Sequence, residues 1–367
     1  MRLRVGVHRE GRPQERGFGR RDLFCAVWLA GLFLVLAQPG AAEPPRKVIL
    51  DTDPGTDDAM AILLALNSPE LDVQAITVVA GNVLLEQGTE NALKVVSLAE
   101  RCDVPVAAGA RRPLAQRLTT AEIWHGANGL GNVEVEPPKC EVDPRFGPDL
   151  IIELVHRQPG EITLVPVGPL TNIALAVLKD PSIVALVKEV VLMGGSVSGG
   201  NVTPAAEFNI YNDPEAAQIV FSAGWRVTMV GLDVTNRTLF RREHLAELAR
   251  TQGRQNDFAV GVLTHLVSLS EEYGFGGASM HDPLAVGVTI DRTLVSTQAM
   301  RVEVETRGER TRGETVANRQ LIVERWSLQG DRYVVTEIER VEPNAEVCIG
   351  VESERFIRLF LSRLRGK

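Results

Sequence analysis

Cysteine is scarce in this chain, with four among 367 residues. Cys25, Cys102, Cys140 and Cys348 are dispersed and form no CxxC pair, which argues against a zinc site built on thiolates. Cys25 lies in an N-terminal segment that we expect to be removed. An exported protein can form one disulfide from the other three cysteines and keep one thiol free. We favour the simpler interpretation, in which all three are buried, inert thiols.

The sequence also lacks an excess of positive charge, and it shows no internal repeat or low-complexity tract. The formal net charge is −8, so the chain offers no basic surface for nucleic acid. Hydrophobic residues make up 44% of the chain and charged residues 23%, which is typical of a soluble globular protein with a sizeable core. The acidic balance by itself identifies no partner.

Residues 1–42 have the organisation of a secretory signal. A basic leader precedes an apolar run at residues 23–37, and Gly40-Ala41-Ala42 supplies the small side chains of a cleavage site. The run is shorter than the ~20 residues that a membrane span needs, so we favour export over a membrane anchor. We expect cleavage after Ala42 and a periplasmic or secreted protein. Arg20-Arg21 is a feature of twin-arginine export, but Asp22-Leu23-Phe24 fits that signal loosely and leaves the route open.

The mature chain, residues 43–367, alternates apolar strands with helical segments. Repeated βα units predict an α/β fold with a mostly parallel central sheet and helices on both faces. From about Thr297 onward, alternating apolar and charged residues predict antiparallel strands, and a terminal helix follows at 353–364. We therefore predict one domain with a β-rich C-terminal extension. The expected parallel strands are Val48–Asp53, Val73–Val79, Ile162–Val167, Val190–Met193 and Val227–Val230, and the antiparallel ones are 298–306, 321–326 and 331–339.

Four aspartates follow the first expected strand, in Asp51-Thr52-Asp53-Pro54-Gly55-Thr56-Asp57-Asp58. The Pro-Gly pair marks a turn, and the apolar stretch 59–66 places Asp57 and Asp58 in the first turn of a helix. Helix capping contributes about 0.3–1 kcal/mol per acid and accounts for one or two of the four. Carboxylates crowded at the end of a parallel strand need a positive charge nearby. We favour a site for a hard divalent cation or for sugar hydroxyls.

Further polar motifs follow other expected strands or lie in glycine-rich loops. They are Val79-Ala80-Gly81-Asn82, Trp124-His125-Gly126-Ala127-Asn128-Gly129, Val167-Gly168-Pro169-Leu170-Thr171-Asn172, the segment from Asn201 to Asn209, Asn212-Asp213-Pro214 and His281-Asp282-Pro283. In open α/β sheets the site lies beyond the carboxyl ends of the strands. In this order, from about Lys47 to Val316, the series resembles the nucleoside hydrolase family of the inosine–uridine-preferring type. The resemblance implies hydrolysis of the N-glycosidic bond of ribonucleosides to free base and ribose, with one bound Ca²⁺.

The resemblance also implies roles for individual residues. Asp53, Asp58 and Asp282 match the calcium carboxylates, and the main-chain carbonyl of Val167 matches a further ligand, an oxygen set that suits Ca²⁺. Asp53 would also accept a proton from the attacking water, and His281, with an unperturbed pKa of ~6.5, would act as the acid for the leaving base. The residues that match the ribose site are Asp57, Asn82 and Asn209 at the 2′- and 3′-hydroxyls, Asn201 and Glu207 at the 5′-hydroxyl, and Phe208 and Met193 along the sugar pocket.

Two loops, Ala121–Asn132 and Leu269–Met280, are expected to sort purine from pyrimidine bases, and the sequence leaves the preference open. His125 is a candidate for contact with the base, with packing inside its loop as the alternative. Trp124 is expected to pack under the loop, while Tyr273 and Phe275 offer aromatic surface. The resemblance further suggests a homodimer or homotetramer. The β-rich piece near 320–341 is longer than the family leads us to expect, and it is either an oligomer contact or a decoration.

Two other functions fit parts of the sequence. A phosphatase of the haloacid dehalogenase type also places two aspartates after a strand, as in Asp51-Thr52-Asp53, but it leaves His281-Asp282 unexplained. An exported nucleoside-binding protein without turnover would keep the calcium pocket. The metal acids occur together with Asp53 and His281, and a receptor has no need of that full set. Release of free base would separate an enzyme from a receptor.

Overall fold

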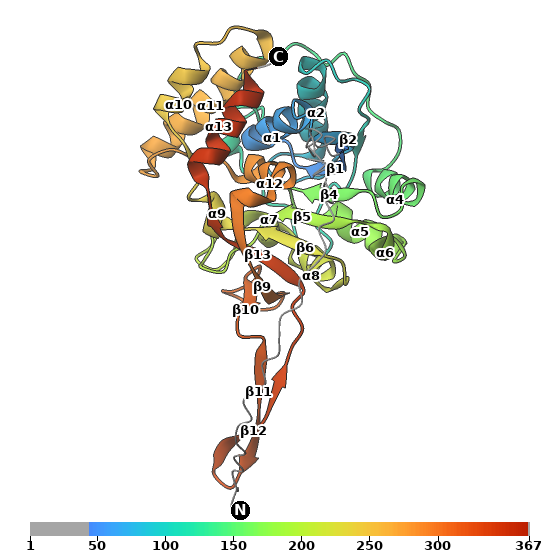
Figure 1. The fold of residues 1–367 in the computed structure, drawn as a ribbon, viewed down its shortest axis with the longest axis vertical. Helices are drawn as coiled ribbons and strands as arrows, with labels where there is room; N and C mark the ends of the chain where they lie inside the picture. The colour runs from blue at the N-terminus through green and yellow to red at the C-terminus, as the bar shows by residue number, and fades with distance from the viewer. Residues whose placement is uncertain (1–43, 366–367) are drawn as a thin grey trace, which may run out of the picture. The chain divides into compact units, whose positions relative to one another are not determined.

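The computed structural model describes residues 44–365, so the expected signal sequence lies outside the described part of the chain. Its centre is a nine-stranded sheet with the order β10-β9-β13-β6-β5-β4-β1-β2-β3 (Figure 1). These strands are β1 (Arg46–Thr52), β2 (Leu71–Val78), β3 (Val106–Ala108), β4 (Thr163–Pro166), β5 (Glu189–Met193), β6 (Val227–Val230), β9 (Val295–Val304), β10 (Thr315–Asn318) and β13 (Ala345–Val351). The neighbours from β13 to β3 all pair in parallel, which confirms the predicted fold class.

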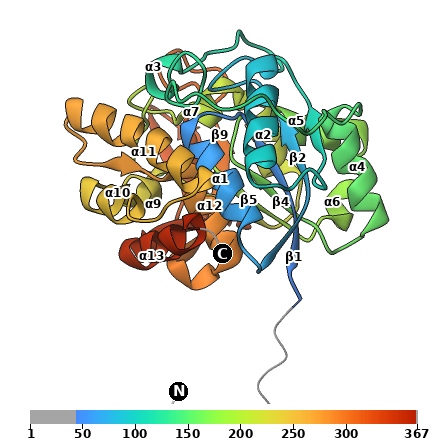
Figure 2. The same cartoon turned by 90° about the horizontal axis from the view of Figure 1, so that it is seen from above.

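Helices cover both faces of the sheet and enclose two hydrophobic cores. The first core is formed with α1 (Thr56–Leu66), α2 (Leu85–Leu98), α10 (Arg242–Leu248), α11 (Arg254–Glu272), α12 (His281–Ile290) and α13 (Ser353–Leu364). The second is formed with α4 (Gly147–Arg157), α5 (Thr171–Lys179), α6 (Ile183–Leu186) and α8 (Pro214–Ser222). Figure 2 shows α4 and α6 on one side of the molecule and α10, α11 and α13 on the opposite side.

Strand β1 shows how the sequence produces this layering. Val48 and Leu50 belong to the first core and Ile49 to the second, because successive side chains of a strand point to opposite faces. Both faces are covered, so the strand is a continuous apolar run rather than an alternating one. Helix α1 is buried along its whole length and packs against α12, which accounts for its apolar composition all round.

The C-terminal part differs from the predicted extension in one respect. Strands β9 and β13 do not form a separate layer but continue the central sheet, with β13 parallel to β6 and antiparallel to β9. Of the strands after residue 290, only β11 (Ile322–Gln329) and β12 (Arg332–Arg340) stand outside that sheet, where they form a hairpin. Short elements complete the described fold: α3 (Glu122–His125), α7 (Phe208–Asn212), α9 (Leu232–Thr235), a 3₁₀ turn at Arg292–Leu294, β7 (Leu239–Phe240) and β8 (Ala278–Ser279). Between residues 44 and 365, no helix combines the length and the apolar character that a membrane crossing requires.

The cysteines correct one expectation. Cys102 and Cys140 form a disulfide, whereas we expected buried thiols, and of the three cysteines in residues 44–365 only Cys348 is a buried free thiol. Cys102 follows α2, and Cys140 lies in the long loop between α3 and α4. The disulfide therefore links the loop between α3 and α4 to the segment that follows α2. The Ser97 hydroxyl of α2 holds the same loop, because it accepts hydrogen bonds from the backbone N–H groups of Lys139 and Cys140.

Reduction of the Cys102–Cys140 disulfide is expected to destabilise the protein. The two residues are 38 positions apart, and the loop-closure entropy for that separation corresponds to about 4 kcal/mol of unfolding free energy. A reducing agent should therefore lower the urea midpoint of the oxidised protein. The double variant Cys102→Ser/Cys140→Ser serves as control, because its midpoint should not respond to the reductant. Equal midpoints for oxidised and reduced wild type would contradict the prediction.

Candidate active site

Two helix N-termini bring carboxylates together at the carboxyl edge of the sheet. Asp57 and Asp58 lie in the first turn of α1, directly after β1, and Asp282 lies in the first turn of α12. Because α1 packs against α12, one carboxylate oxygen from each of these three residues lies within 4.8 Å of the other two. Asp53 sits between β1 and α1 and is close enough to raise the pKa of Asp282 by repulsion.

Asp58 is held by four hydrogen bonds from its own loop and the next one. Its Oδ1 accepts from the Thr52 hydroxyl at 2.6 Å and from the Asp53 N–H at 3.2 Å. Its Oδ2 accepts from the Gly55 N–H at 3.0 Å and from the Asn82 side-chain amide at 2.9 Å. These donors fix the position of a carboxylate that is fully buried.

Asp53 is held on one side only. Its Oδ2 accepts from the Asn82 N–H at 2.6 Å, while its buried Oδ1 has no hydrogen-bond partner within residues 44–365. The surrounding backbone comes very close: a Cβ at Gly81 would lie 2.0 Å from Oδ2, and one at Gly168 would lie 2.5 Å from Oδ1. Burial and the charge of Asp58 raise the pKa of Asp53 well above its usual value. The unpartnered oxygen is therefore a strong candidate for a ligand or proton acceptor.

The electrostatics of this cluster fit a cation. Burial, and then repulsion from Asp58, raises the pKa of Asp57 to about 7, and burial with repulsion from Asp57 raises that of Asp282 well above normal. No Lys or Arg of the described chain lines the cavity that these acids face. Carboxylate and carbonyl oxygens in a buried cluster are the ligands that hard divalent cations prefer. The donor set thus fits a divalent metal ion.

The carbonyl of Val167 lies on the same side of the site, at the end of β4. It accepts from the Asn209 side-chain amide at 2.7 Å, and that amide also donates to the Met193 carbonyl at 3.2 Å. With its N–H groups bound to the ends of β4 and β5, Asn209 keeps its Oδ1 for another partner. Asn209 is itself placed by Glu207, whose side chain caps α7.

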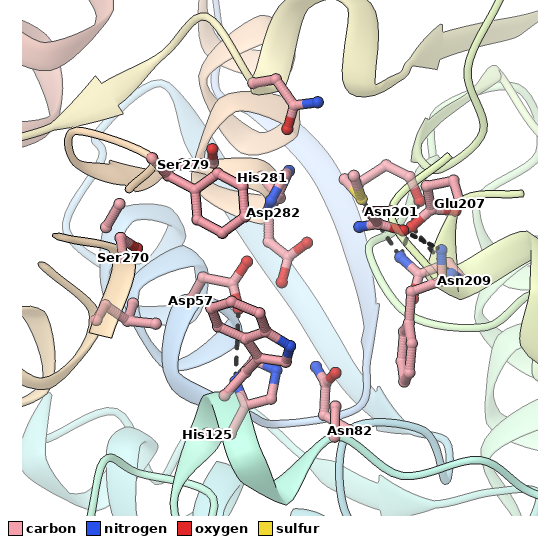
Figure 3. Close-up of a pocket in the computed structure, with 18 of the residues that line it drawn as sticks. Asp57, Asn82, His125, Asn201, Glu207, Asn209, Ser270, Ser279, His281 and Asp282 are labelled. Carbon is pink, nitrogen blue, oxygen red and sulfur yellow. Dashed lines mark hydrogen bonds and ion pairs between the residues drawn. The ribbon is translucent and has the colours of Figure 1, made fainter. Parts of the chain in front are cut away.

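A cavity of about 560 Å³ opens in front of the acidic cluster. Figure 3 shows the carboxylates of Asp57 and Asp282 on one side, and Asn201, Glu207 and Asn209 on the other. Most of the residues singled out in the sequence line it: Asp57, Asn82, His125, Val167, Met193, Asn201, Glu207, Phe208, Asn209, His281 and Asp282. Asp53 and Asp58 do not line the cavity but lie buried behind Asp57 and Asp282.

Glu207 is buried with both of its oxygens bound to backbone. Oε1 accepts from the Asn209 N–H at 2.9 Å, and Oε2 accepts from Gly195 at 3.0 Å and Ile210 at 3.1 Å. Burial raises the pKa of Glu207, and the three backbone donors oppose this effect. A carboxylate has about four lone-pair sites, so Glu207 can still accept a hydrogen bond from a hydroxyl group in the cavity. Asn201 stands beside it, with Oδ1 accepting the Phe208 N–H at 2.9 Å.

The two histidines of the cavity are held in defined orientations. Nδ1 of His281 lies 2.8 Å from the Thr235 hydroxyl, and Nδ1 of His125 accepts the Thr56 N–H at 3.0 Å. Burial lowers the pKa of each to about 4, so both rings are neutral at neutral pH. The sequence analysis used the unperturbed pKa of His281, and the desolvation of this half-buried side chain lowers it. In the tautomer in which Nδ1 accepts the Thr235 hydroxyl, the ring presents Nε2–H as a hydrogen-bond donor.

His125 approaches so closely that its neighbour has to be glycine: a Cβ at Gly55 would lie 2.5 Å from Nδ1. His125 also lies 3.9 Å from an oxygen of Asp57. His125 therefore has the packing role that the sequence analysis gave as one of two alternatives. It also lines the cavity.

The two predicted base loops meet at the mouth of the cavity. The Trp124 ring packs against Tyr273, with centroids 5.2 Å apart, and against Phe275, at 6.1 Å. Trp124 therefore packs as expected, but it also lines the cavity together with Phe275. The sequence analysis assigned no role to Asn236, Ser270 and Ser279, which line the same region. Ser270 and Ser279 lie inside the segment 269–280 that was predicted to contact the base. Asn236 follows the short helix α9, and no sequence motif indicates it.

Asp51, the first aspartate of the motif, has a structural role that the sequence did not indicate. Its Oδ1 accepts from Thr77 at 2.5 Å and from the Asn172 amide at 2.7 Å, and Asn172 also donates to the Val78 carbonyl. Burial raises the pKa of Asp51 to about 7. This network joins β1, β2 and α5 beneath the site.

Comparison with known proteins places these features in a family. The model of the family described as inosine-uridine preferring nucleoside hydrolase matches residues 48–358. An inosine-uridine preferring nucleoside hydrolase of Leishmania major is 45% identical over 276 residues, which cover 75% of this chain and 88% of that protein. A pyrimidine-specific ribonucleoside hydrolase, RihA, of Salmonella arizonae is 39% identical over 324 residues, or 87% and 98% of the two chains.

Solved structures agree with this similarity. The plant nucleoside hydrolase PpNRh1 matches with a TM-score of 0.80 and 36% identity, covering 88% of this chain and 100% of that one. A purine-preferring ribonucleoside hydrolase from Gardnerella vaginalis matches with a TM-score of 0.78 and 35% identity, covering 87% and 98%. The bases named for these relatives include purines and pyrimidines.

Addition of Ca²⁺ to chelator-treated protein is expected to raise its melting temperature. A ligand that binds only the native state at a hundred times its Kd stabilises by about 2.7 kcal/mol, which corresponds to about 5 °C for a chain of this size. Differential scanning calorimetry with and without the ion measures this shift. Asp282→Asn should abolish the shift, whereas Asp257→Asn, at an exposed position of α11, should keep it. An equal shift in both variants would place the ion elsewhere.

Proposed function

This chain belongs to the inosine-uridine preferring nucleoside hydrolase family, and we propose that it cleaves ribonucleosides with Ca²⁺ as its cofactor and Asp53 as its general base. Family membership makes it an N-glycosyl hydrolase that acts on ribonucleosides. The observation that carries the finer proposal is the buried acidic cluster facing a wall of hydroxyl-binding side chains across one cavity. A nucleoside-binding protein without turnover is not favoured, because the named relatives are hydrolases.

Asp53, Asp58, Asp282 and the Val167 carbonyl would hold the ion. Two of these acids, Asp58 and Asp282, form a cluster with Asp57 in the structure, and Val167 and Asp282 line the cavity. When bound, Ca²⁺ would neutralise the cluster, bind ribose hydroxyls and make a coordinated water more acidic. Two observations support this assignment: the unpartnered Oδ1 of Asp53 and the lack of Lys or Arg among the described cavity residues.

Asp53 would accept the proton of the attacking water. The water oxygen forms a bond to C1′ of the ribose while the bond from C1′ to the base nitrogen breaks, with the electron pair leaving on the base. Positive charge develops on the sugar in between, as in glycosidases. The buried carboxylates of Asp57 and Asp282 stabilise that charge because they lie in a low-dielectric site.

The opposite wall would hold and orient the ribose. The free Oδ1 of Asn209 and the side chains of Asp57 and Asn82 would bind the 2′- and 3′-hydroxyls, and Asn201 and Glu207 would bind the 5′-hydroxyl; all five residues line the cavity. Four of these side chains are fixed by hydrogen bonds to the backbone or to another buried residue: Asn82, Asn201, Glu207 and Asn209. Such orientation lowers the barrier without any contact to the base. Phe208 and Met193 supply the apolar part of the sugar pocket.

His281 would assist the leaving base. Because its ring is neutral and its Nδ1 faces Thr235, the group that it offers to a base nitrogen is the Nε2–H. A hydrogen bond from this donor strengthens as negative charge builds on the departing base. His125 lies on the adjacent wall and is a second contact for the base.

The protein would act outside the cytoplasm and as a homo-oligomer. The organisation of residues 1–42 supports export, and the Cys102–Cys140 disulfide is typical of proteins in oxidising compartments. Export would direct the enzyme to external nucleosides. A dimer or tetramer is the assembly that we propose.

Asp53→Ala is expected to abolish ribose release from inosine and uridine. Loss of a general base that also binds the cofactor should lower kcat at least 10²–10⁴-fold. A reducing-sugar assay on the mature protein measures both substrates, and their ratio gives the base preference. Asp257→Asn is the matched control and should retain full activity. Wild-type protein that is folded, holds Ca²⁺ and releases no ribose would contradict the proposal.

His281→Ala tests the leaving-group role within the same experiment. The variant should lose most of its activity on inosine and uridine. It should keep much more on a riboside with a good leaving group, such as p-nitrophenolate, which needs no hydrogen bond to depart. An equal loss on all three substrates would assign His281 a structural role.

The exported protein is expected to begin at Glu43. Mass spectrometry of protein recovered from the periplasm or medium of an expressing bacterium would show the mass of residues 43–367. Replacement of Arg20-Arg21 by two lysines should block export if the twin-arginine route is used and leave it unchanged if the general secretory route is used. Retention of the full-length chain in the cytoplasm would contradict export.

A further inference from the structure

The β11–β12 hairpin is a feature that the reaction does not use. It follows the edge strand β10 and projects away from the central sheet (Figure 1). All residues of β11 and seven of the nine in β12 are exposed. An isolated two-stranded hairpin is marginally stable in water, so an exposed ribbon of this length calls for a partner surface.

The register of the hairpin sorts its side chains onto two unlike faces. Directly paired residues share a face, and successive residues alternate. One face, here called the apolar face, carries Glu324 and Arg340 and six apolar side chains: Ile322, Trp326, Leu328, Tyr333, Val335 and Ile338. The other face is mostly polar and includes the ion pair between Arg325 and Glu339. The hairpin is therefore amphipathic, like a strand pair that covers a core.

The apolar face is open to solvent within the described chain. Trp326 is 58% exposed, Leu328 62%, Ile338 63% and Tyr333 69%. Together the six side chains leave on the order of 500 Å² of apolar surface exposed, since a large aromatic alone contributes about 150–250 Å² when fully buried. The largest apolar patch of a typical monomer spans about 300–600 Å² and is often functional, so an exposed face of this size is a candidate interaction surface.

We propose that two copies of this chain associate through the apolar faces of their β11–β12 hairpins. The face is electrically neutral and self-complementary, because its two charges, Glu324 and Arg340, are of opposite sign. In a two-fold, antiparallel packing, Ile322 meets Leu328 of the second copy. The same packing places Arg340 over the Tyr333 ring of the second copy and Glu324 at the indole N–H of its Trp326. Each buried charge thus meets a group that can bind it.

The area is consistent with a dimer contact. A standard interface buries about 800 Å² per partner, so the hairpin would supply more than half and the adjoining sheet edge the rest. Insertion into a membrane is less consistent, because the tip of the hairpin is Gln329-Gly330-Asp331-Arg332, which is polar. The chain is also acidic overall, which disfavours binding to anionic lipid. The proposal concerns assembly and does not depend on the reaction.

Sedimentation velocity of residues 43–367, whose described part forms one compact unit, tests the proposal. Wild type should sediment as a dimer or a larger assembly at about 10 µM. Trp326→Glu, on the apolar face, should halve the mass of the assembly, while Ser327→Glu, on the opposite face of the same strand, should leave it unchanged. Ribose release should be the same in both variants, because the hairpin is remote from the cavity residues. A monomeric wild type, or an unchanged Trp326→Glu assembly, would overturn the proposal.

A complementation experiment tests the identity of the partner. Ile322→Lys and Leu328→Glu should each weaken self-association, but an equimolar mixture should form a heterodimer, because the antiparallel packing sets these positions against each other. Failure of the mixture to associate would refute that packing. Vesicles of phosphatidylcholine and phosphatidylglycerol provide the second arm: capture of wild type but not of Trp326→Glu by the vesicles would show a lipid surface instead and overturn the proposal.

Discussion

The interior of the site is dominated by repulsion between buried carboxylates. Asp53, Asp57, Asp58 and Asp282 are all buried within one small volume, and their burial raises the pKa of Asp53, Asp57 and Asp282. Such a cluster is unfavourable unless hydrogen-bond donors and a positive charge offset it. The donors come from backbone N–H groups, from Thr52 and from the Asn82 amide. Because these leave net negative charge, the binding of a cation and the stability of this part of the fold are coupled.

The sheet order explains why the acids and their neighbours can meet. Strand β1 lies between β2 and β4, so the loops after these three strands converge on the same point. Asp53, Asn82 and Val167 are contributed by those three loops. The approach is possible only because Gly81 and Gly168 carry no side chain, since a Cβ at either would overlap the carboxylate of Asp53. Two features therefore determine the geometry of the acidic site: the adjacency of three parallel strands and the two glycines beside Asp53.

The parts of the molecule that sequence predicted are those determined by local pattern. The apolar run 48–50 predicted a parallel strand, because a strand that is buried on both faces is a continuous run of apolar residues. The aspartates that follow this run predicted a polar site. Strand β13 was not predicted at all, since none of the expected strands covers residues 345–351, and its pairing with β6 joins segments that are far apart in the sequence. The Cys102–Cys140 disulfide depends on how the long loop between α3 and α4 returns to the end of α2. The lowered pKa of His281 depends on desolvation by segments that are distant in the sequence. Neither is encoded in the neighbouring residues.

The cavity has two halves that differ in how they are held. On the side proposed for ribose, the Asn82 amide donates to the Asp58 carboxylate, Glu207 accepts backbone N–H groups, and the Asn209 amide donates to the Val167 carbonyl. A substitution at any of these three residues would leave buried donors or acceptors unpaired. On the side proposed for the base, the cavity lining includes Trp124, Phe275 and Ser279, which come from two connecting segments that meet through aromatic packing. Aromatic contacts tolerate changes of side chain better than a buried polar network does. A scaffold built in this way keeps its ribose requirement while its base preference varies, which agrees with relatives named for purines and for pyrimidines.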